Sequence, residues 1–413
     1  MTHIAIGERI RTMRKIRHLS VRQLAAKALI STSLLEKIEC GDRNPSPALV
    51  VALAKALAVG PEILHGQPYY NSTESDEQIQ AVIPDLRRVL ATYDNPDDLE
   101  TGPRPLEILA QETAQVSKLR QDASYVRMGS LLPGLLAELG HTALESTGDE
   151  QLRAYWWLAR GYRAANSLAH KLGHHDLSAT ALERFRWAAD RSRDPHMQVT
   201  ASYLRAGMLV RLGAFGSARR ILNGLLGEID HLAPEGSYTD ELVALRGAVQ
   251  LKLAMVEVRD GETDRAGVLL DEAAETAAIG GNRDTDLYEM AFGPTNVRIH
   301  RVAALIDGGT ADEALARLAE WGDEQGLPEW ELPAGLVAER ASHHHIDVAA
   351  AKLLQGDRVG SFSSLRQARE LAPAHTRFHP TVRHTAERLV HADRSADESL
   401  VAFAAWAGVR KTG

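Results

Sequence analysis

The sequence contains a single cysteine, Cys40, among 413 residues. One cysteine forms no internal disulfide, so a disulfide-stapled secreted scaffold is excluded and a reducing compartment is favoured. The chain also has no uncharged apolar run of 18 residues, which argues against a membrane-spanning helix. Its first residues, MTHIAIGERIRTMRK, carry charges where a signal peptide needs an apolar stretch. We therefore expect a cytoplasmic protein with no membrane partner.

Common catalytic motifs are also missing. The sequence has no HExxH, P-loop, GxSxG or glycine-rich dinucleotide pattern. Histidines at positions 343–345, 375, 379 and 384 could supply metal ligands, but no cysteine or clear carboxylate set accompanies them. We predict that the protein is not an enzyme and has no metal ion or cofactor, and that these histidines are solvated or hydrogen-bonded. A metallohydrolase built on them is the alternative.

Lysine is scarce as well, at nine residues, and the excess of arginine, alanine and glycine indicates a GC-rich bacterial genome. Charge is distributed unevenly along the chain. Residues 1–66 hold ten Lys or Arg against five Asp or Glu, while the whole chain has a net charge of −8. The N-terminal part therefore carries +5 and the remainder −13. A basic segment joined to an acidic body predicts an anionic partner for the basic segment alone.

Residues 1–66 show the pattern of five short helices. The segment IGERIRTMRKIR places four apolar side chains on one stripe at helical spacing. Polar caps predict where later helices begin: Ser20 with Gln23 as a capping box, Ser31, and Ser46 followed by proline. Gly41 ends the third predicted helix, and a Gly-Pro pair at 60–61 ends the fourth.

The next stretch, QPYYNSTESDEQ at residues 67–78, is polar and interrupts this periodicity, which predicts a linker. From residue 79 to residue 413, helix-length apolar patterns recur, and no segment shows the sustained alternation of a strand. The predicted fold is therefore all-α, with a five-helix domain followed by a long helical region.

The long helical region is repetitive. Five glycines recur at intervals of 40, 48, 48 and 47 residues: Gly173, Gly213, Gly261, Gly309 and Gly356. Five or six positions after each stands a small residue: Ala179, Ala218, Ala266, Ala314 and Ser361. Glycine permits the tight turn of a helical hairpin, and a small side chain lets the second helix approach the first. The pattern, with closing prolines at 195 and 373, resembles tetratricopeptide repeats at longer spacing; an irregular helical domain is the alternative.

Two predicted helices joined by ALIS, residues 28–31, fit a helix-turn-helix whose second helix enters the major groove of DNA. Residues 4–66 resemble the Cro/repressor-like (XRE) family of regulators. The matching segments are RTMR at 11–14, QLA at 23–25, IS at 30–31, LEKIECGDRNPSPALVVALAKAL at 35–57 and VGPEIL at 59–64. The resemblance implies a repressor-like domain that binds double-stranded DNA.

The resemblance also implies roles for individual residues. Positions that reach base edges in the family match Thr32, Ser33, Leu34, Glu36 and Lys37. Positions that contact phosphates match Arg22, Arg43 and Asn44, for which ordinary solvated charge is the alternative. Arg14 and Glu39 match a structural pair that links the first and third helices. Leu29 stands where the family usually has glycine, so we expect either a reshaped turn or a buried Leu29.

One such domain reads few bases, so we expect a homodimer on a pseudo-palindromic operator with half-sites about 34 Å apart. A helical solenoid offers a concave surface for a peptide or a partner protein. Domain order resembles that of the quorum-sensing peptide receptors of the RRNPP class, which implies a peptide or small-molecule effector. Candidate effector contacts are Tyr155, Trp156, Tyr162 and Asn166, with core packing as the alternative for the aromatic residues.

The sequence thus predicts a DNA-binding transcription regulator whose repeat domain, residues 79–413, dimerises and senses a peptide, a small molecule or a partner protein. The alternative is a protein-interaction scaffold whose DNA-binding domain only localises it. A ligand that shifts operator affinity in purified protein favours the first reading, whereas dependence on a second protein favours the other.

Overall fold

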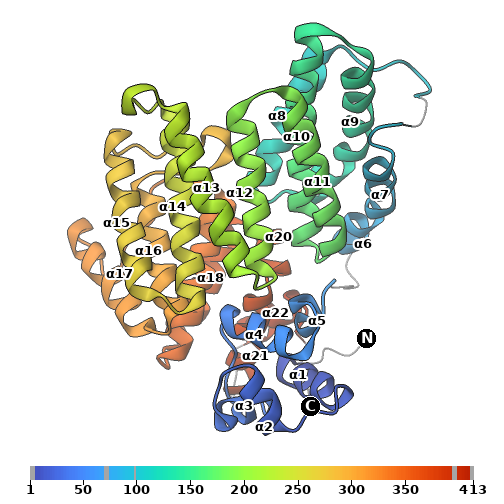
Figure 1. The fold of residues 1–413 in the computed structure, drawn as a ribbon. Helices are drawn as coiled ribbons and strands as arrows, with labels where there is room; N and C mark the ends of the chain where they lie inside the picture. Colours follow the sequence, from blue (N-terminus) through green and yellow to red (C-terminus); the bar gives the residue numbers. More distant parts are fainter. Residues whose placement is uncertain (1–4, 69–73, 97–98, 393–397, 410–413) are drawn as a thin grey trace.

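The computed structural model describes residues 5–68, 74–96, 99–392 and 398–409. Within these ranges the chain is all-α, as the sequence predicts, apart from two short 3-10 turns and an isolated β-bridge between Thr285 and Phe292. A small N-terminal domain lies beneath a long stack of antiparallel helices (Figure 1). No helix in these ranges is both long and apolar enough to cross a membrane.

Five helices make up the N-terminal domain. They are α1 (Ile6–Ile16), α2 (Val21–Lys27), α3 (Thr32–Glu39), α4 (Pro47–Leu57) and α5 (Pro61–His65). The predicted capping box forms, because Ser20 Oγ accepts from the Gln23 amide while the Ser20 amide donates to Gln23 Oε1. Ser31 and Ser46 cap α3 and α4 through their hydroxyl oxygens. These caps satisfy backbone N–H groups that the first turn of each helix leaves free.

Leu29 lies in the turn between α2 and α3. Its φ is +57°, in the left-handed region, and 92% of its surface is exposed. Both expected alternatives are therefore wrong, since the turn keeps the left-handed conformation that glycine would adopt and Leu29 is not buried. Its neighbours Ala28 and Ile30 fill the inner side of the turn, with Ala28 buried and Ile30 packed against the core, so the side chain between them points outward. The strain of a left-handed leucine is not offset by packing here.

The predicted linker extends too far along the chain. Residues 69–73 lie outside the described residues, but helix α6 (Glu74–Ala81) already begins at Glu74. The last five residues of the predicted linker are helical, because Glu and Gln are good helix formers and Ile79 is buried where α6 meets α9. Helix α7 (Ile83–Ala91) follows directly.

Six antiparallel pairs form the repeat domain within the described ranges. They are α8 (Leu106–Gln121) with α9 (Tyr125–Glu145), α10 (Gly148–Lys171) with α11 (His175–Ser192), α12 (Pro195–Arg211) with α13 (Phe215–Leu232), α14 (Asp240–Asp260) with α15 (Thr263–Ile279), α16 (Pro294–Gly308) with α17 (Ala311–Gln325), and α18 (Ala338–Leu354) with α19 (Arg358–Leu371). Short turns η1 (Pro234–Gly236) and η2 (Leu287–Glu289) interrupt the stack. Helices α20 (Pro373–Phe378), α21 (Pro380–Ala392) and α22 (Glu398–Trp406) complete the C-terminal end.

The five predicted glycines each form the turn inside a helix pair, with φ between 72° and 92°. The small residue five positions later is buried in each of these five pairs. In the pair α10–α11 that residue is Ser178 and not Ala179, which the sequence alignment had placed one residue too far along. Asn166 on α10 donates to the carbonyl and hydroxyl oxygens of Ser178, at 2.8 and 2.9 Å. A small residue at this position lets the two helices approach closely.

The first helices of successive pairs form one layer, in which α12 contacts α14, α14 contacts α16, and α16 contacts α18. Because these first helices contact one another directly, we assign their layer to the inner, concave side of the solenoid. The two ends of the stack meet across that side. Lys171 on α10 forms an ion pair with Glu339 on α18, with Nζ and Oε1 2.5 Å apart.

The N-terminal domain docks on the repeat domain through its α5 side. The His65 ring stacks on His384 of α21, with ring centroids 5.4 Å apart. Gln67 Oε1 lies 3.3 Å from His175 Nε2 at the start of α11. Helices α2 and α3 lie on the opposite side of the domain, facing away from the solenoid (Figure 1). Docking therefore leaves α3 uncovered.

Candidate nucleic-acid interface

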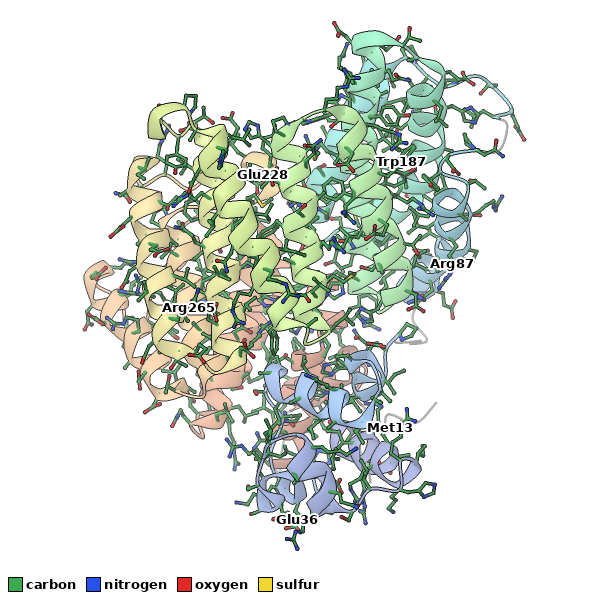
Figure 2. The ribbon with its side chains drawn as sticks, viewed as in Figure 1. Met13, Glu36, Arg87, Trp187, Glu228 and Arg265 are labelled. Atoms are coloured by element: carbon green, nitrogen blue, oxygen red, sulfur yellow. The ribbon has the colours of Figure 1, made fainter. Side chains whose placement is uncertain are left out.

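The outer face of α3 carries four exposed polar or charged side chains. Thr32, Ser33, Glu36 and Lys37 are exposed, because a spacing of three to four residues places them on one helical face. The opposite face is buried in the domain core through Leu35 and Ile38. Glu36 marks the end of the molecule farthest from the repeat helices in Figure 2.

Leu34 differs from the other four predicted base-contacting residues. Its side chain is partly buried and packs against the core of the N-terminal domain. Its amide donates to Ser31 Oγ at 3.1 Å in the first turn of α3. The structure therefore brings four of the five predicted residues together on the exposed face and places Leu34 at its inner edge.

Arg14 and Glu39 connect α1 to the C-terminal end of α3. Arg14 Nε and Nη2 donate to the two carboxylate oxygens of Glu39 at 2.6 and 2.7 Å. Arg14 Nη1 also donates to the Leu19 carbonyl at 3.0 Å. The hydrogen bond to Glu39 raises the pKa of Arg14, which keeps the guanidinium charged. A two-point ion pair of this kind fixes the orientation of α3 relative to α1.

Basic groups flank the exposed face of α3. Arg22 is exposed in the first turn of α2, and Arg43 is exposed in the α3–α4 loop beside the half-buried Asn44. The Arg43 amide donates to the Lys37 carbonyl at 3.1 Å, which ties the loop to α3. Sequence reasoning missed Arg388 on α21, whose Nη2 donates to the Asp42 carbonyl at 3.5 Å. No sequence signal could have found it, since it is 346 residues away from Asp42.

The predicted effector contacts are mostly part of the core. Tyr155, Tyr162 and Asn166 are 6%, 1% and 9% exposed, so they offer almost no surface to a ligand. Asn166 is held by Ser178, and Tyr155 packs edge-on against Trp187 with centroids 5.4 Å apart. Trp156 is only partly buried, and its Nε1 donates to Asp194 Oδ2 at 2.7 Å. The core-packing alternative describes these aromatic residues, because consecutive helices close over them.

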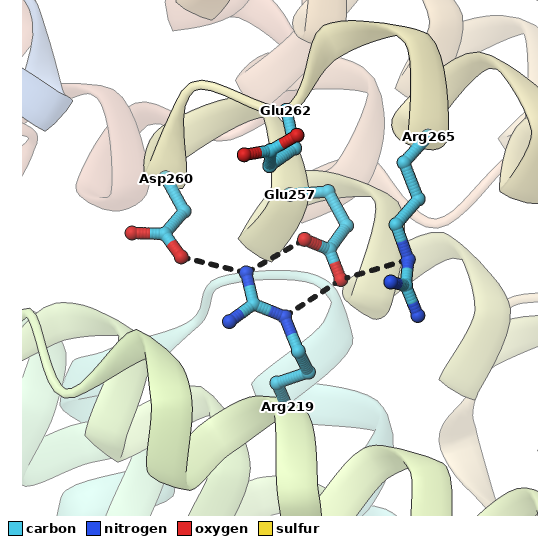
Figure 3. Close-up of a pocket in the computed structure, with 5 residues that line it drawn as sticks. All are labelled: Arg219, Glu257, Asp260, Glu262 and Arg265. Atoms are coloured by element: carbon cyan, nitrogen blue, oxygen red, sulfur yellow. Dashed lines mark hydrogen bonds and ion pairs between the residues drawn. The ribbon is translucent and has the colours of Figure 1, made fainter.

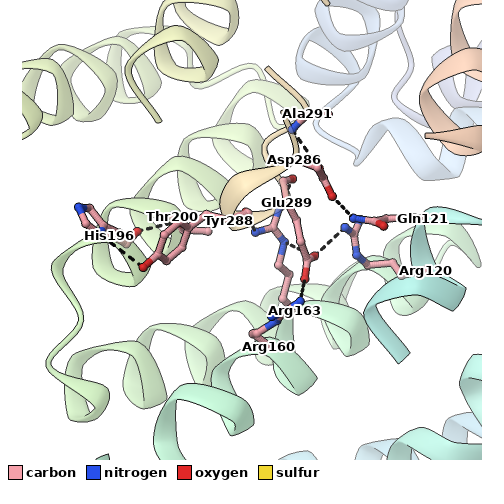
Figure 4. A network of polar contacts seen from close by, with 10 residues as sticks. All are labelled: Arg120, Gln121, Arg160, Arg163, His196, Thr200, Asp286, Tyr288, Glu289 and Ala291. Atoms are coloured by element: carbon pink, nitrogen blue, oxygen red, sulfur yellow. Dashed lines mark hydrogen bonds and ion pairs between the residues drawn. The ribbon is translucent and has the colours of Figure 1, made fainter. Parts of the chain in front are cut away.

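A polar network joins the α15–α16 loop to helices α8 and α10 (Figure 4). Glu289, in the α15–α16 loop, contacts Arg120, Arg160 and Arg163 at 2.6, 3.0 and 3.3 Å. Burial by itself raises the pKa of Glu289, but the three guanidinium groups outweigh it and hold that pKa well below the ordinary range. Tyr288 beside it has a left-handed φ of +49°. The arginines thus hold a strained loop segment against α8 and α10.

A polar pocket is lined by Arg219, Glu257, Asp260, Glu262 and Arg265 (Figure 3). Arg219 donates to both oxygens of Glu257 at 2.8 and 2.6 Å and to Asp260 at 2.6 Å. Glu257 is 1% exposed. Because Arg219 on α13 pairs with Glu257 and Asp260 on α14, the pocket is lined by an ion-pair crosslink between these two helices.

The comparisons with known proteins concern mainly the N-terminal domain. A helix-turn-helix domain family matches residues 5–65. An uncharacterised HTH-type transcriptional regulator of Mycobacterium tuberculosis is 41% identical over 59 residues, which are 14% of this chain and 42% of the length of that relative. The immunity repressor protein of Bacillus phage phi105 is 31% identical over 132 residues, covering 28% of this chain and 91% of the repressor.

Among solved structures, PlcR of Bacillus thuringiensis, in complex with the peptide PapR7 and DNA, aligns with 93% of this chain and 98% of its own, at 12% identity and a TM-score of 0.29. The match to the immunity repressor is the more informative one, since it spans nearly all of that protein. This chain therefore belongs to the family of helix-turn-helix transcriptional regulators that includes the phage immunity repressor.

Proposed function

We propose that the protein is a sequence-specific DNA-binding transcription regulator that inserts α3 into the major groove. The observation that carries this proposal is the exposed face of α3, formed by Thr32, Ser33, Glu36 and Lys37 on a helix that faces away from the repeat domain. Lysine and hydroxyl side chains donate to guanine and adenine acceptors, and a carboxylate accepts from the cytosine amino group. Phosphate contacts by Arg22, Arg43 and Asn44 would fix the register of the helix.

The direct test is selection of bound duplexes from a random library with the full-length protein, followed by binding measurements at several salt concentrations. We expect an enriched motif and an affinity that falls steeply with salt, as for any protein that displaces counterions from phosphates. Absence of both an enriched motif and salt-sensitive binding would overturn the proposal. Mapping of bound sites in the bacterial chromosome would then identify the regulated genes. A protein that binds chromosomal sites has to be located in the cytoplasm, which is part of this proposal.

A homodimer is part of this proposal. A single N-terminal domain presents one short helix to DNA, which buries too little surface for tight specific binding. Two copies on a pseudo-palindrome, with half-sites about 34 Å apart, would supply the remaining affinity. The dimer contacts would come from the repeat domain, since α3 must stay free. Sedimentation of the free protein and the symmetry of the selected motif test this point separately.

The repeat domain is proposed to sense an effector that carries an anionic group. Lys252 on α14 and Arg211 on α12 face the same point on the inner layer. The position where a Cβ of Gly207 would stand lies 3.1 Å from Lys252 Nζ and 3.7 Å from Arg211 Nη1. Burial, followed by the nearby Arg259, lowers the pKa of Arg211 to about 10. Two desolvated cations held together favour a carboxylate or phosphate ligand over a neutral one.

This effector proposal is tested by measuring operator affinity in the presence of inorganic phosphate, an acidic peptide and its amide-neutralised counterpart. We expect the anionic compounds to shift the affinity and the neutral peptide to leave it unchanged. Lys252→Met should abolish the shift. Equal effects of the charged and neutral peptides would overturn the proposal, and a shift that requires a second protein would favour the scaffold alternative.

A further inference from the structure

Three histidines from distant positions meet at the C-terminal end of the solenoid. His343 lies on α18, His375 on α20, and His379 directly follows α20. One ring nitrogen from each lies within 4.8 Å of the other two. The ring centroids are 5.0 to 5.7 Å apart. The expectation that these side chains are solvated or hydrogen-bonded describes His343, whose side chain is 40% exposed, and His375, which accepts from Lys171. The sequence did not predict that helix packing gathers the three rings into one cluster.

Two ring nitrogens of this cluster are buried without a hydrogen-bond partner among the described residues: His375 Nε2 and His379 Nδ1. His375 is only 1% exposed. A buried polar atom without a partner costs free energy, so its presence calls for a ligand.

Other histidines near the cluster have partners of their own. The His384 ring stacks on His65, and the His344 ring lies edge-on to Trp330 with centroids 5.6 Å apart. Those contacts account for their burial by packing. The cluster of three is different, since its rings meet one another and its nitrogens converge on a common point.

We propose that His343, His375 and His379 bind one divalent transition-metal ion of the zinc class. Imidazole nitrogen suits zinc, nickel and copper, whereas calcium and magnesium prefer oxygen ligands. Zinc–nitrogen bonds of about 2.0 Å place two ligand nitrogens about 3.4 Å apart, so the rings need to close by little more than 1 Å. Three histidines leave a fourth position for water or an outside ligand. The side chain of His343 is 40% exposed, which gives the ion a path from solvent.

Lys171 sets the strength of this site. Its Nζ lies 3.3 Å from His375 Nδ1 and is paired with Glu339 at 2.5 Å. An imidazole that accepts from Lys171 at Nδ1 carries its hydrogen at Nε2, the nitrogen that faces no partner. The metal ion and the Lys171 ammonium group therefore compete for His375. Removing the ammonium group would also remove the ion-pair partner of Glu339 Oε1.

The test is titration of the untagged full-length protein with Zn²⁺ in competition with a chromophoric chelator, together with metal analysis of the dialysed protein. We expect one equivalent per chain. His375→Ala and His379→Ala should each weaken binding by at least about tenfold. His231→Ala is the matched control, since His231 is exposed on α13 and far from the cluster in sequence, and it should bind as the wild type does.

A wild-type protein without stoichiometric Zn²⁺, or equal affinity in the wild type and both cluster variants, would overturn the proposal. Where the alanine variants fail to fold, Lys171→Met decides. Tighter binding than in the wild type supports the site, and equal or weaker binding overturns it. None of these outcomes depends on DNA binding, so the metal-site proposal is tested independently of the proposed function.

Discussion

Arg14 and Glu39 stand 25 residues apart in the sequence and form a two-point ion pair with nitrogen–oxygen distances of 2.6 and 2.7 Å. Their side chains are only 10% and 7% exposed. Removing either one leaves the other charge desolvated and without its partner. Because the pair joins α1 to the end of α3, it couples the stability of the N-terminal domain to the orientation of the exposed face of α3 that we propose contacts DNA bases.

The first prediction follows from this pair. Glu39→Ala should lower the free energy of unfolding of the N-terminal domain by about 3 kcal/mol, since a buried guanidinium loses its counter-charge. The double variant Arg14→Met with Glu39→Met should recover most of that loss. Residues 1–66 contain no tryptophan, tyrosine or phenylalanine, so a fluorophore on the exposed Cys40 can report urea unfolding of this domain. A double variant as unstable as Glu39→Ala would contradict the argument.

The second prediction separates base contacts from phosphate contacts. Lys37→Ala and Ser33→Ala should change the preferred sequence, each with a loss of about 1 to 3 kcal/mol at the bases they contact. Arg43→Ala should weaken binding to all sequences alike and lower the salt slope by about one. Competition binding with single-base variants of the selected motif measures both effects.

Arg317→Ala, on the exposed surface of α17, is the control for loss of one positive charge. It should leave the salt slope unchanged. The assignment of Lys37 and Ser33 as base-contacting residues would be wrong if Lys37→Ala and Ser33→Ala lowered affinity equally for every duplex.

The third prediction concerns the left-handed Leu29. Leu29→Gly should stabilise the N-terminal domain by about 1 kcal/mol, because glycine adopts a φ of +57° without the clash of a Cβ. The gain is partly offset by the greater freedom of glycine in the unfolded chain. Leu29→Ala keeps the Cβ and should give no such gain. Unfolding of the Cys40-labelled protein in urea compares the three chains, and equal midpoints would show that the turn is unstrained.

The fourth prediction is a pH dependence set by Glu289. Its folded-state pKa is lowered below the ordinary value of about 4.3, so its stabilising effect is fully present above that pH and is lost as the pH falls through the folded-state pKa. Glu289→Gln should therefore cost about 3 kcal/mol near neutral pH and progressively less in acid. Tryptophan fluorescence during urea unfolding follows the repeat domain.

Glu320→Gln serves as the control for this measurement, since Glu320 forms an exposed ion pair with Arg317 and should contribute little at any pH. A difference between the wild type and Glu289→Gln that stayed constant down to strongly acidic pH would contradict the role of the Glu289 charge.

Local signals in the sequence were enough to predict the fold of the N-terminal domain. Ser20, Ser31 and Ser46 cap helices with their own hydroxyl groups, so the starts of α2, α3 and α4 depend on residues within three positions. The glycines of the repeats are equally local, because each allows the positive φ of its own turn. The misplacement of Ala179 for Ser178 shows the limit of aligning repeats by residue type, because serine and alanine are both small enough for this position and only the structure shows which one is buried.

The sequence by itself determined the helices of the N-terminal domain, the five glycine-centred helix pairs and the polar face of α3, because those depend on residues close in the chain. Only the tertiary structure decided which distant groups meet. Helix packing buries Tyr162 and places Glu289 beside three arginines of α8 and α10. It also brings His343, His375 and His379 together in one cluster. Such meetings depend on how the solenoid curves and closes, and that curvature is a property of the summed packing of all its helices.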